Sequence, residues 1–443
     1  MPQISKDELL AEGKTKKIYS VKENPELVIV ESKDQLTAFG GSKSHELTGK
    51  AIIANKTAVR IFHFLRSVGI NSHLVEIFGD NAFLARKCTM IPIEFVIRRI
   101  ATGSFLKRHV TIKEGHRFCP PRVETFFKDD AQNDPEWSFE EVGQLKVKLP
   151  NGEFRLDSIS YLRQMIEGSR AIFECLEKAW STKNCVLVDM KIEFGIDDTT
   201  GELLLADVID NDSWRLWPEG DQRLMKDKEL YRRMDVVTAD GLATVLKNFK
   251  WVAEQLETFV PRPICRVILV MGSEADMPFC EKIRMECMNL GVGPVHLHVA
   301  SAHKTTTATL DLISKYEGDG ISTVVIAVAG RSNGLGPVIS ANSCIPVMNC
   351  PPPDEQWSSS DVWSSLRVPS GLGCSTVMFP QTAALQAAQI LGLTNAFIWC
   401  KVRGRLLQNQ LLVFRSDDKI LFKGSPEIPA FPFEDAEANQ NGN

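Results

Sequence analysis

The residues best suited to chemistry lie in one short stretch of the chain, residues 186–217. It carries carboxylates together with a lysine and an arginine, and the side chains of most interest are Asp189, Lys191, Glu193, Asp207, Asp210, Asp212, Ser213 and Arg215. Mg²⁺ prefers oxygen ligands and is usually held by one or two carboxylates together with substrate phosphates. The stretch therefore predicts a site for Mg²⁺ and a phosphate group. The alternative is a solvated polar face with ordinary ion pairs.

The local pattern indicates how these side chains would be brought together. Two runs with strand character, residues 186–194 and 202–208, flank a turn-rich segment, so we expect a β-hairpin. Because successive strand residues point to opposite faces, Asp189, Lys191 and Glu193 should share one face, with apolar side chains opposite.

Two further segments of the first half have the composition of phosphate sites. Residues 13–17, Gly-Lys-Thr-Lys-Lys, place Lys14 and Lys16 beside a glycine turn, where lysines can lie against ATP phosphates as point charges. A later strand ends in Arg-Arg-Ile-Ala-Thr-Gly-Ser, residues 98–104, whose guanidinium, hydroxyl and backbone N–H groups suit a sugar phosphate. Taken alone, each segment is more often an exposed surface turn.

The whole chain bounds the class of protein. Its 443 residues exceed one ordinary core, so two domains are expected. A net charge of −5 argues against a general nucleic-acid binder. The first residues lack a signal or transit peptide and no run is apolar enough for a membrane helix, which indicates a cytosolic protein. The 11 cysteines have no zinc-like spacing and are expected to be reduced.

Two prolines in residues 259–263 mark a linker, which we take as the domain boundary. Amphipathic helices are expected before it at residues 49–68, 157–180 and 238–259. After it, strands alternate with helices; the strands are residues 267–271, 296–300, 323–329 and 345–349, and the helices follow near residues 277, 306 and 381. This alternation predicts a parallel sheet covered on both faces.

Three turns follow strands of that sheet and should meet at its carboxyl edge, at residues 272–276, 301–304 and 330–337. The candidate roles are a phosphate contact for Ser273, a ribose contact for Asp276, proton transfer for His303 and anion binding for Lys304 or Arg331. Each turn alone would more often be a cap or tight turn. Their convergence on one edge favours a site.

The end of the chain, residues 396–443, is expected to begin as a helix, to form strands over residues 409–423 and to finish in about 20 disordered residues.

At these motifs the sequence resembles a known family over residues 8–405. The segments GKTK, RRIATGSFLKR, FFKDDAQNDP, LVDMKIEFG and LADVIDNDSWRLWP resemble SAICAR synthetases, and MGSEAD, SAHK and AGRSNGLGPV resemble AIR carboxylases. AIR is aminoimidazole ribonucleotide, CAIR its carboxylated form and SAICAR the succinocarboxamide product. The order of the motifs resembles that of the animal bifunctional purine enzymes, which fuse the two.

For the first half, the resemblance implies an α+β, ATP-grasp-like SAICAR synthetase that joins CAIR to L-aspartate with ATP hydrolysis through an acyl phosphate. Lys14 and Lys16 would approach the ATP phosphates, and Glu193 and Asp207 would hold Mg²⁺. The CAIR-binding positions carried over from the family are Arg98, Ser104, Ser213 and Arg215.

For the second half, it implies a flavodoxin-like, three-layer α/β carboxylase that adds CO₂ to AIR without biotin or ATP. The form AGRSNGLGP indicates the class that uses CO₂ directly. His303 and Lys304 would be catalytic, with Ser273, Asp276, Ser301, Arg331 and Ser332 as AIR or CO₂ contacts. The family also implies a homo-octamer, and no nucleic-acid or membrane partner is expected.

The expected domains are a synthetase at residues 1–260, a linker at 261–264, a carboxylase at 265–408 and a partly disordered extension at 409–443. One departure stands out, because Phe39-Gly40 occupies the place of the family's Gly-Asn or Gly-Asp. Two alternatives stay open: a carboxylase whose impaired synthetase half serves assembly, which this departure motivates, and a scaffold that only senses nucleotides. His303 and Lys304 argue against the scaffold, since binding needs no proton carrier.

Overall fold

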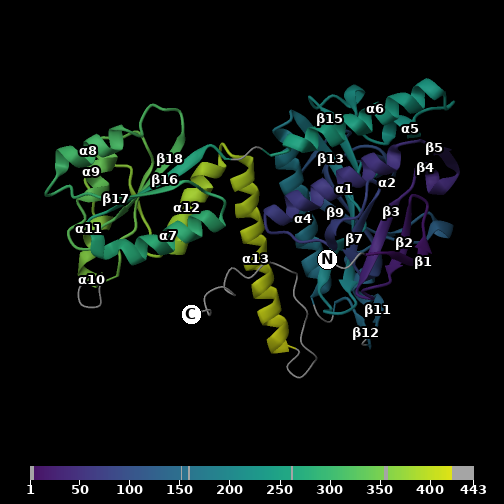
Figure 1. Cartoon of the computed structure of the whole chain (residues 1–443), viewed down its shortest axis with the longest axis horizontal. Coiled ribbons are helices and arrows are strands. Elements are labelled where there is room, and N and C mark those ends of the chain that lie inside the picture. The colour runs from purple at the N-terminus through teal and green to yellow at the C-terminus, as the bar shows by residue number, and fades with distance from the viewer. Residues whose placement is uncertain (1–3, 151, 158–159, 261–262, 354–357, 422–443) are drawn as a thin grey trace. The chain divides into compact units, whose positions relative to one another are not determined.

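The computed structural model describes residues 4–150, 152–157, 160–260, 263–353 and 358–421 (Figure 1). Contacts divide these into two compact units, an N-terminal unit of residues 4–260 with 404–421 and a C-terminal unit of residues 263–403. Within these ranges, no helix has both the length and the apolar character that crossing a membrane requires.

The N-terminal unit begins with an antiparallel sheet of five strands. Their spatial order is β1 (Lys6–Glu12), β2 (Lys16–Val21), β3 (Leu27–Ser32), β7 (Ala82–Arg86) and β6 (Leu74–Ile77). Helix α1 (Lys50–Ser67), where one was expected, packs on β3 and β7 through buried residues such as Ile61 and Phe62. A hairpin of β4 (Gln35–Ala38) and β5 (Lys43–Glu46) lies beside it in sequence.

A second sheet carries most of the chemistry-bearing residues. Its order is β10 (Glu136–Trp137), β9 (Arg117–Phe127), β8 (Cys88–Ile100), β13 (Cys185–Asp197) and β14 (Leu203–Ala206), and β15 (Trp214–Pro218) also pairs with β13. Helix α4 (Tyr161–Ser181) packs against β8, β9 and β13. The expected hairpin is confirmed, since β13 and β14 pair antiparallel with Glu193 opposite Ala206.

Shorter elements complete this unit. They are α2 (Ser104–Arg108), α3 (Phe139–Gln144), β11 (Lys146–Leu149), β12 (Gly152–Arg155), α5 (Glu229–Arg232) and α6 (Ala239–Gln255). Helix α6 packs against α1.

The C-terminal unit is a parallel sheet with helices on both faces, as its alternation predicted. The strand order is β17 (Val295–Val299), β16 (Cys265–Met271), β18 (Ser322–Val328), β19 (Val347–Asn349) and β20 (Ser375–Thr376). Alternate residues of β16 face opposite cores. Val267 and Leu269 pack with α7 (Met277–Asn289) and α12 (Pro380–Gly392), whereas Ile268 and Val270 pack with α8 (Thr306–Ser314) and α9 (Leu335–Ala341). Two short helices, α10 (Ser358–Asp361) and α11 (Trp363–Leu366), precede β20.

The strands expected at residues 409–423 are wrong as far as the structure describes that segment. Helix α13 runs from Ala396 to Leu421. Gly404, Leu407 and Leu411 are buried at helical spacing, and a side chain at Gly404 would lie 2.3 Å from the carbonyl oxygen of Val68. Packing against the N-terminal unit therefore overrides the strand propensity of the Leu-Leu-Val-Phe run. The tail expected to be disordered lies outside the described residues.

Candidate functional site

One cleft of about 1970 Å³ in the N-terminal unit brings together every site residue expected in the first half of the chain. Its lining includes Lys14, Lys16, Arg98, Ser104, Glu193, Asp207, Ser213 and Arg215. They lie on β2, β8, α2, β13 and β15 or in the turns beside β2, β14 and β15. The solvated polar face considered for the hairpin is wrong, because Asp189 and Glu193 are only 5% and 2% exposed.

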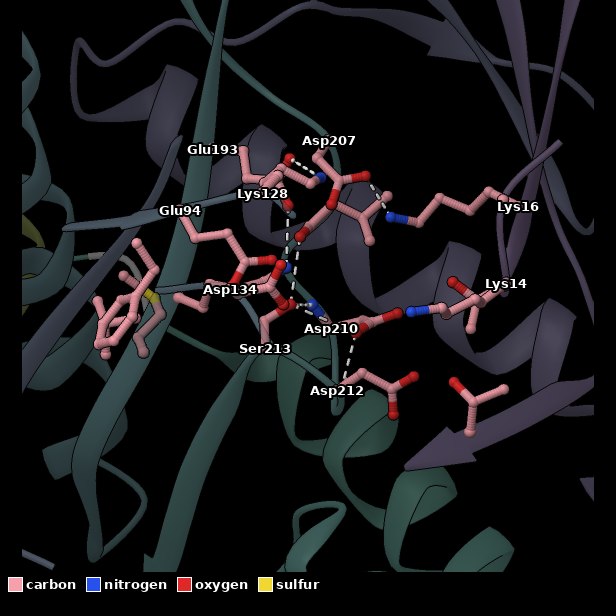
Figure 2. A pocket seen from close by; sticks show the side chains of 18 of the residues that line it. Lys14, Lys16, Glu94, Lys128, Asp134, Glu193, Asp207, Asp210, Asp212 and Ser213 are labelled. Atoms are coloured by element: carbon pink, nitrogen blue, oxygen red, sulfur yellow. Dashed lines mark hydrogen bonds and ion pairs between the residues drawn. The ribbon is translucent and has the colours of Figure 1, made fainter. Parts of the chain in front are cut away.

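At one end of the cleft, carboxylates alternate with lysines (Figure 2). Oε2 of Glu193 accepts a hydrogen bond from Nζ of Lys128 at 2.7 Å, and Oε1 accepts one from Nζ of Lys191 at 2.9 Å. Lys191 also donates to Glu94 at 2.7 Å, and Lys16 donates to Asp207. The carboxylates are thus held in place by cations and present oxygen atoms to the cleft.

These contacts set the charge of the buried groups. Burial would raise the pKa of the Asp207 carboxyl, but Lys16 and Lys191 outweigh it and hold that pKa well below its usual range. Burial would lower the pKa of Lys191, but Glu193 and Glu94 raise it well above its usual value. Both groups are therefore charged at neutral pH.

A second group of ionisable side chains joins the lining residues Asp210, Asp212 and Lys228 to the buried Lys50. Nζ of Lys50, itself 2% exposed, lies 3.2 Å from Oδ2 of Asp212, and Lys228 lies 3.6 Å from the same atom. Burial and the neighbouring charge of Asp212 raise the pKa of Asp210. The Asp210 backbone N–H donates to Oγ of Ser213 at 3.1 Å, which fixes that hydroxyl at the cleft wall.

At the other end, one carboxylate aligns two arginines. Asp189 on β13 is the register partner of Arg98 on β8 and of Arg215 on β15. Oδ2 of Asp189 accepts hydrogen bonds from Nη1 of Arg98 at 2.6 Å and from Nη1 of Arg215. The two guanidinium groups therefore converge, and that of Arg215 lies against Gly103, directly before α2.

The segment that departs from the family pattern borders this cleft. Phe39, Gly40 and Gly41 form a tight turn with φ of 52°, 66° and 99°, and Phe39 is 64% exposed. A Cβ on Gly41 would lie 3.6 Å from Cε of Lys14, so the turn packs beside that lysine. The departure thus changes the rim of the cleft.

The carboxylates beside Lys16 and Lys128 form a donor set that suits a metal ion. Glu193 and Asp207 offer the carboxylate oxygens that Mg²⁺ prefers, beside lysines suited to phosphates. Among the described residues, the group whose atoms lie close enough to share an ion is His109, Glu124 and Glu136. There, however, the guanidinium of Arg108 donates to both carboxylates at 2.8 Å and takes the place of a cation.

The candidate residues of the C-terminal unit lie at the carboxyl edge of its parallel sheet, as expected. Gly272 follows β16, Ser301 follows β17 shortly after its end, and Gly330 follows β18. A Cβ added to Gly272 would lie 3.7 Å from Cβ of Ala329, which shows that two of these turns are neighbours.

The turn at residues 301–304 contacts the turn at residues 330–337 through His303. A Cβ on Gly334 would lie 2.9 Å from Nε2 of His303, so residues 330–336 pack directly against this ring. His303, Lys304, Arg331 and Ser332 are exposed.

Part of the capping alternative is also correct for these turns. Oγ of Ser273 accepts the N–H of Ala275 at 3.3 Å, and Oγ of Ser301 accepts the N–H of Lys304 at 3.3 Å. Asp276 is half-buried, and burial raises its pKa. The serines therefore shape the turns whether or not they also contact a ligand.

Sequence reasoning missed several residues of the N-terminal cleft. Glu94 had a usable signal, because it precedes Arg98 by four residues and so shares its strand face. Lys228 and His73 had none, since only the tertiary fold brings them into the cleft.

Known proteins match both units. The model of the SAICAR synthetase family matches residues 9–248, and that of the AIR carboxylase family matches residues 266–410. The human bifunctional phosphoribosylaminoimidazole carboxylase/phosphoribosylaminoimidazole succinocarboxamide synthetase is 52% identical over 93% of this chain and 96% of its own. Its Drosophila melanogaster counterpart is 50% identical over 93% and 95%. A crystal structure of the synthase from Ehrlichia chaffeensis is 30% identical over 56% of this chain and 98% of its own, with a TM-score of 0.49.

Proposed function

Because the chain belongs to the family of bifunctional AIR carboxylases and SAICAR synthetases of purine biosynthesis, we propose specific roles for its two sets of site residues. The N-terminal unit, with an ATP-grasp-like fold, binds ATP, CAIR and L-aspartate in its cleft. The C-terminal unit, with a flavodoxin-like fold, carboxylates AIR at the edge of its sheet. The domain limits proposed are residues 1–260 and 265–408, with a linker at 261–264 and an extension at 409–443.

The phosphate end of the cleft takes ATP. Lys14 and Lys16 approach its phosphates, and Glu193 and Asp207 hold Mg²⁺. Such an ion would supply positive charge that stabilises the phosphoryl group during its transfer. Support comes from Asp207, whose pKa the neighbouring lysines lower, so that it is an ionised oxygen donor at neutral pH.

The opposite end takes CAIR, through Arg98, Ser104, Ser213 and Arg215. The single observation that carries this assignment is the convergence of Arg98 and Arg215 on one oxygen of Asp189, at 2.6 Å for Arg98. Two guanidinium groups held side by side can bind an anion in a defined orientation.

The synthetase reaction then proceeds in two steps. A carboxylate oxygen of CAIR attacks the γ-phosphorus of ATP, and ADP leaves with the electrons of the broken P–O bond. The amine of L-aspartate next attacks the carbonyl carbon of the acyl phosphate, phosphate leaves, and the amine proton passes to solvent. The cleft's cations lower the barrier by stabilising charge on the transferring group.

In the C-terminal unit, carbon 4 of AIR attacks CO₂ without biotin or ATP, and the proton displaced from that carbon passes to His303. Lys304 assists as the second catalytic group. Ser273, Asp276, Ser301, Arg331 and Ser332 contact AIR or CO₂. Support comes from the position of His303, whose ring packs against residues 330–336 at the carboxyl edge of the sheet.

The protein is further proposed to work in the cytosol as a homo-octamer. Its substrates are then small molecules only, and neither nucleic acid nor membrane is a partner.

One experiment tests the assignment of the N-terminal unit. Purified protein is given CAIR, L-aspartate, Mg²⁺ and ATP, and SAICAR and ADP are followed together. Equal amounts of both are expected, and AIR with bicarbonate provides the second assay. Carboxylation of AIR without SAICAR would mean that the synthetase half is impaired, as the Phe39-Gly40 departure first suggested.

A further inference from the structure

Glu124 lies beneath the end of the cleft assigned to CAIR. It belongs to β9, its side chain is 1% exposed, and it is not among the described residues that line the cleft. Its Oε2 accepts a hydrogen bond from Nε of Arg98, and its Oε1 accepts one from Nη2 of Arg108 at 2.8 Å. Nε2 of His109 lies 3.7 Å from Oε1. One buried carboxylate therefore holds two arginines by hydrogen bonds and has the ring of His109 close by.

The contact with Arg98 fixes the orientation of its guanidinium. Glu124 holds Nε on one side, and Asp189 holds Nη1 at 2.6 Å on the other. The planar group is thereby held at two points and cannot rotate without breaking a charge-assisted hydrogen bond. Such a group loses little conformational entropy when it binds an anion.

The contact with Arg108 extends this control to α2. Nη1 of Arg108 lies within 3.4 Å of the carbonyl oxygen of Ser104, at the opposite end of the short helix. The ring of Phe105, between them in sequence, lies against the ring of His109 with a centroid distance of 4.3 Å and a tilt of 32° between the ring planes. Glu124 thus connects the strand that carries Arg98 with the helix that carries Ser104.

We propose that Glu124 is a positioning residue for CAIR, acting through Arg98 and through Arg108 on α2. The inference rests on the proposed CAIR site. It predicts that loss of the Glu124 charge weakens CAIR binding and leaves ATP binding nearly unchanged, because the ATP phosphates are assigned to the other end of the cleft.

The neighbouring arginine supplies a matched control. Arg99 follows Arg98 on β8 and is also buried, at 7% exposure. Its Nε and Nη2 donate to the two oxygens of Glu177 at 2.7 and 2.6 Å, on α4. Arg99 is not among the described residues that line the cleft. Glu177→Gln therefore removes a comparable ion pair from the same strand without touching the cleft.

The test measures binding of CAIR and, separately, of ATP with Mg²⁺ by titration calorimetry on the full chain. Glu124→Gln should raise the Kd for CAIR about tenfold or more, because a hydrogen bond to a charged group is lost. Its Kd for ATP should change less than about twofold, since no ATP contact is altered. Glu177→Gln should change neither constant, and Glu124→Asp, which keeps the charge, should recover part of the CAIR affinity.

A double-mutant cycle shows whether Glu124 acts through Arg98. Arg98→Lys should lower CAIR affinity, and adding Glu124→Gln should then cost much less than in the wild-type chain. Equal losses of CAIR affinity in Glu124→Gln and Glu177→Gln would overturn the proposal. It would also be overturned if the fold-change in Kd for CAIR of the double variant equalled the product of the fold-changes of Glu124→Gln and Arg98→Lys. If Glu124→Gln also loses affinity for ATP, its fold is damaged, and Glu124→Asp becomes the test. That variant must then weaken CAIR binding without changing the Kd for ATP, or the proposal fails.

This readout also separates the inference from the proposed function. A wild-type chain that binds CAIR but makes no SAICAR would refute the synthetase assignment. The Kd values for CAIR of the Glu124 variants would still test the positioning role of Glu124. A wild-type chain that binds no CAIR would refute both.

Discussion

Gly103 and Arg215 are packed so closely that no side chain fits between them. A Cβ on Gly103 would lie 2.6 Å from Nη2 of Arg215, and Gly103 has a φ of 61°. Under 3.0 Å something must shift, and the group that would shift is a guanidinium assigned to CAIR. The glycine in the Ala-Thr-Gly-Ser turn is therefore tied to the geometry of the site.

Gly103→Ala should raise the KM for CAIR about tenfold, because Arg215 must move away from the new methyl group and loses part of a charge-assisted contact. The variant should also unfold more readily, by about 1–3 kcal/mol, since alanine resists this backbone conformation. Gly115→Ala is the matched control, because Gly115 has a φ of 81° but no atom within 4 Å of the added Cβ. It should lose stability and keep its KM. The same rise in the KM for CAIR in both variants would show that the contact between Gly103 and Arg215 is not needed for CAIR binding.

Gly334→Ala should impair carboxylation of AIR at least about tenfold by displacing the ring of His303, whose Nε2 would lie 2.9 Å from the new Cβ. Conversion of CAIR to SAICAR should be unchanged. His303→Ala should abolish carboxylation with the same selectivity. Gly373→Ala, which has no atom within 4 Å of its Cβ, serves as the control in the same unit. Undiminished carboxylation by His303→Ala would show that the imidazole of His303 takes no part in the reaction.

Removal of divalent metal should affect only one of the two activities. Treatment with EDTA should stop formation of both SAICAR and ADP, and added Mg²⁺ should restore them, because Glu193 and Asp207 are assigned to the ion. Carboxylation of AIR should continue at its former rate in the same sample. SAICAR formation that survives chelation would show that these carboxylates serve only the neighbouring lysines.

His73 should make the N-terminal unit less stable in mild acid. Burial lowers the pKa of its imidazole from 6.5 to about 4. Between these two values the unfolded chain binds more protons than the folded one, so the free energy of unfolding falls as the pH drops from 6.5 to 4. The change should reach about 3 kcal/mol. Thermal unfolding of the full chain across this pH range checks it, with His73→Phe as comparison.

The comparison isolates His73 from other titrating groups. Burial raises the pKa of Asp227 to about 6, so this carboxyl contributes stability in the opposite direction as the pH falls. Asp227 is present in both chains, and its effect cancels in the difference between them. Phenylalanine suits the site, because His73 already packs against the rings of Phe62 and Phe83. Unfolding curves whose pH dependence is the same in both chains would contradict the prediction.

The spacing of apolar and polar residues along the chain correctly predicted the strand at residues 186–194 and the parallel sheet of the C-terminal unit. The alternation along residues 186–194 correctly placed Asp189, Lys191 and Glu193 on one face of a strand. The repeated strand and helix signals after residue 263 likewise predicted the parallel sheet and the edge at which its three turns meet. In these segments, the pattern of apolar residues and the tertiary packing agree.

The rest depended on contacts between distant segments. Glu124 had no local signal, because its role depends on cations from β8 and from α2. The end of the chain was misread for a related reason. Leu411 and its neighbours have strand propensity, but burial of Gly404 and Leu407 against the N-terminal unit makes them helical.

Strand β13 also sets the distance between the two substrate sites proposed for the cleft. Asp189, which aligns the arginines, and Glu193, at the phosphate end, are four residues apart on one face of it. Extended backbone rises by about 3.3 Å per residue, so the two anchor points are separated by roughly 13 Å. The strand thus fixes the distance between the site proposed for CAIR, which accepts the phosphoryl group, and the site proposed for ATP, which donates it. An inserted residue in this strand would turn every later side chain to the opposite face and would misalign the two substrates together.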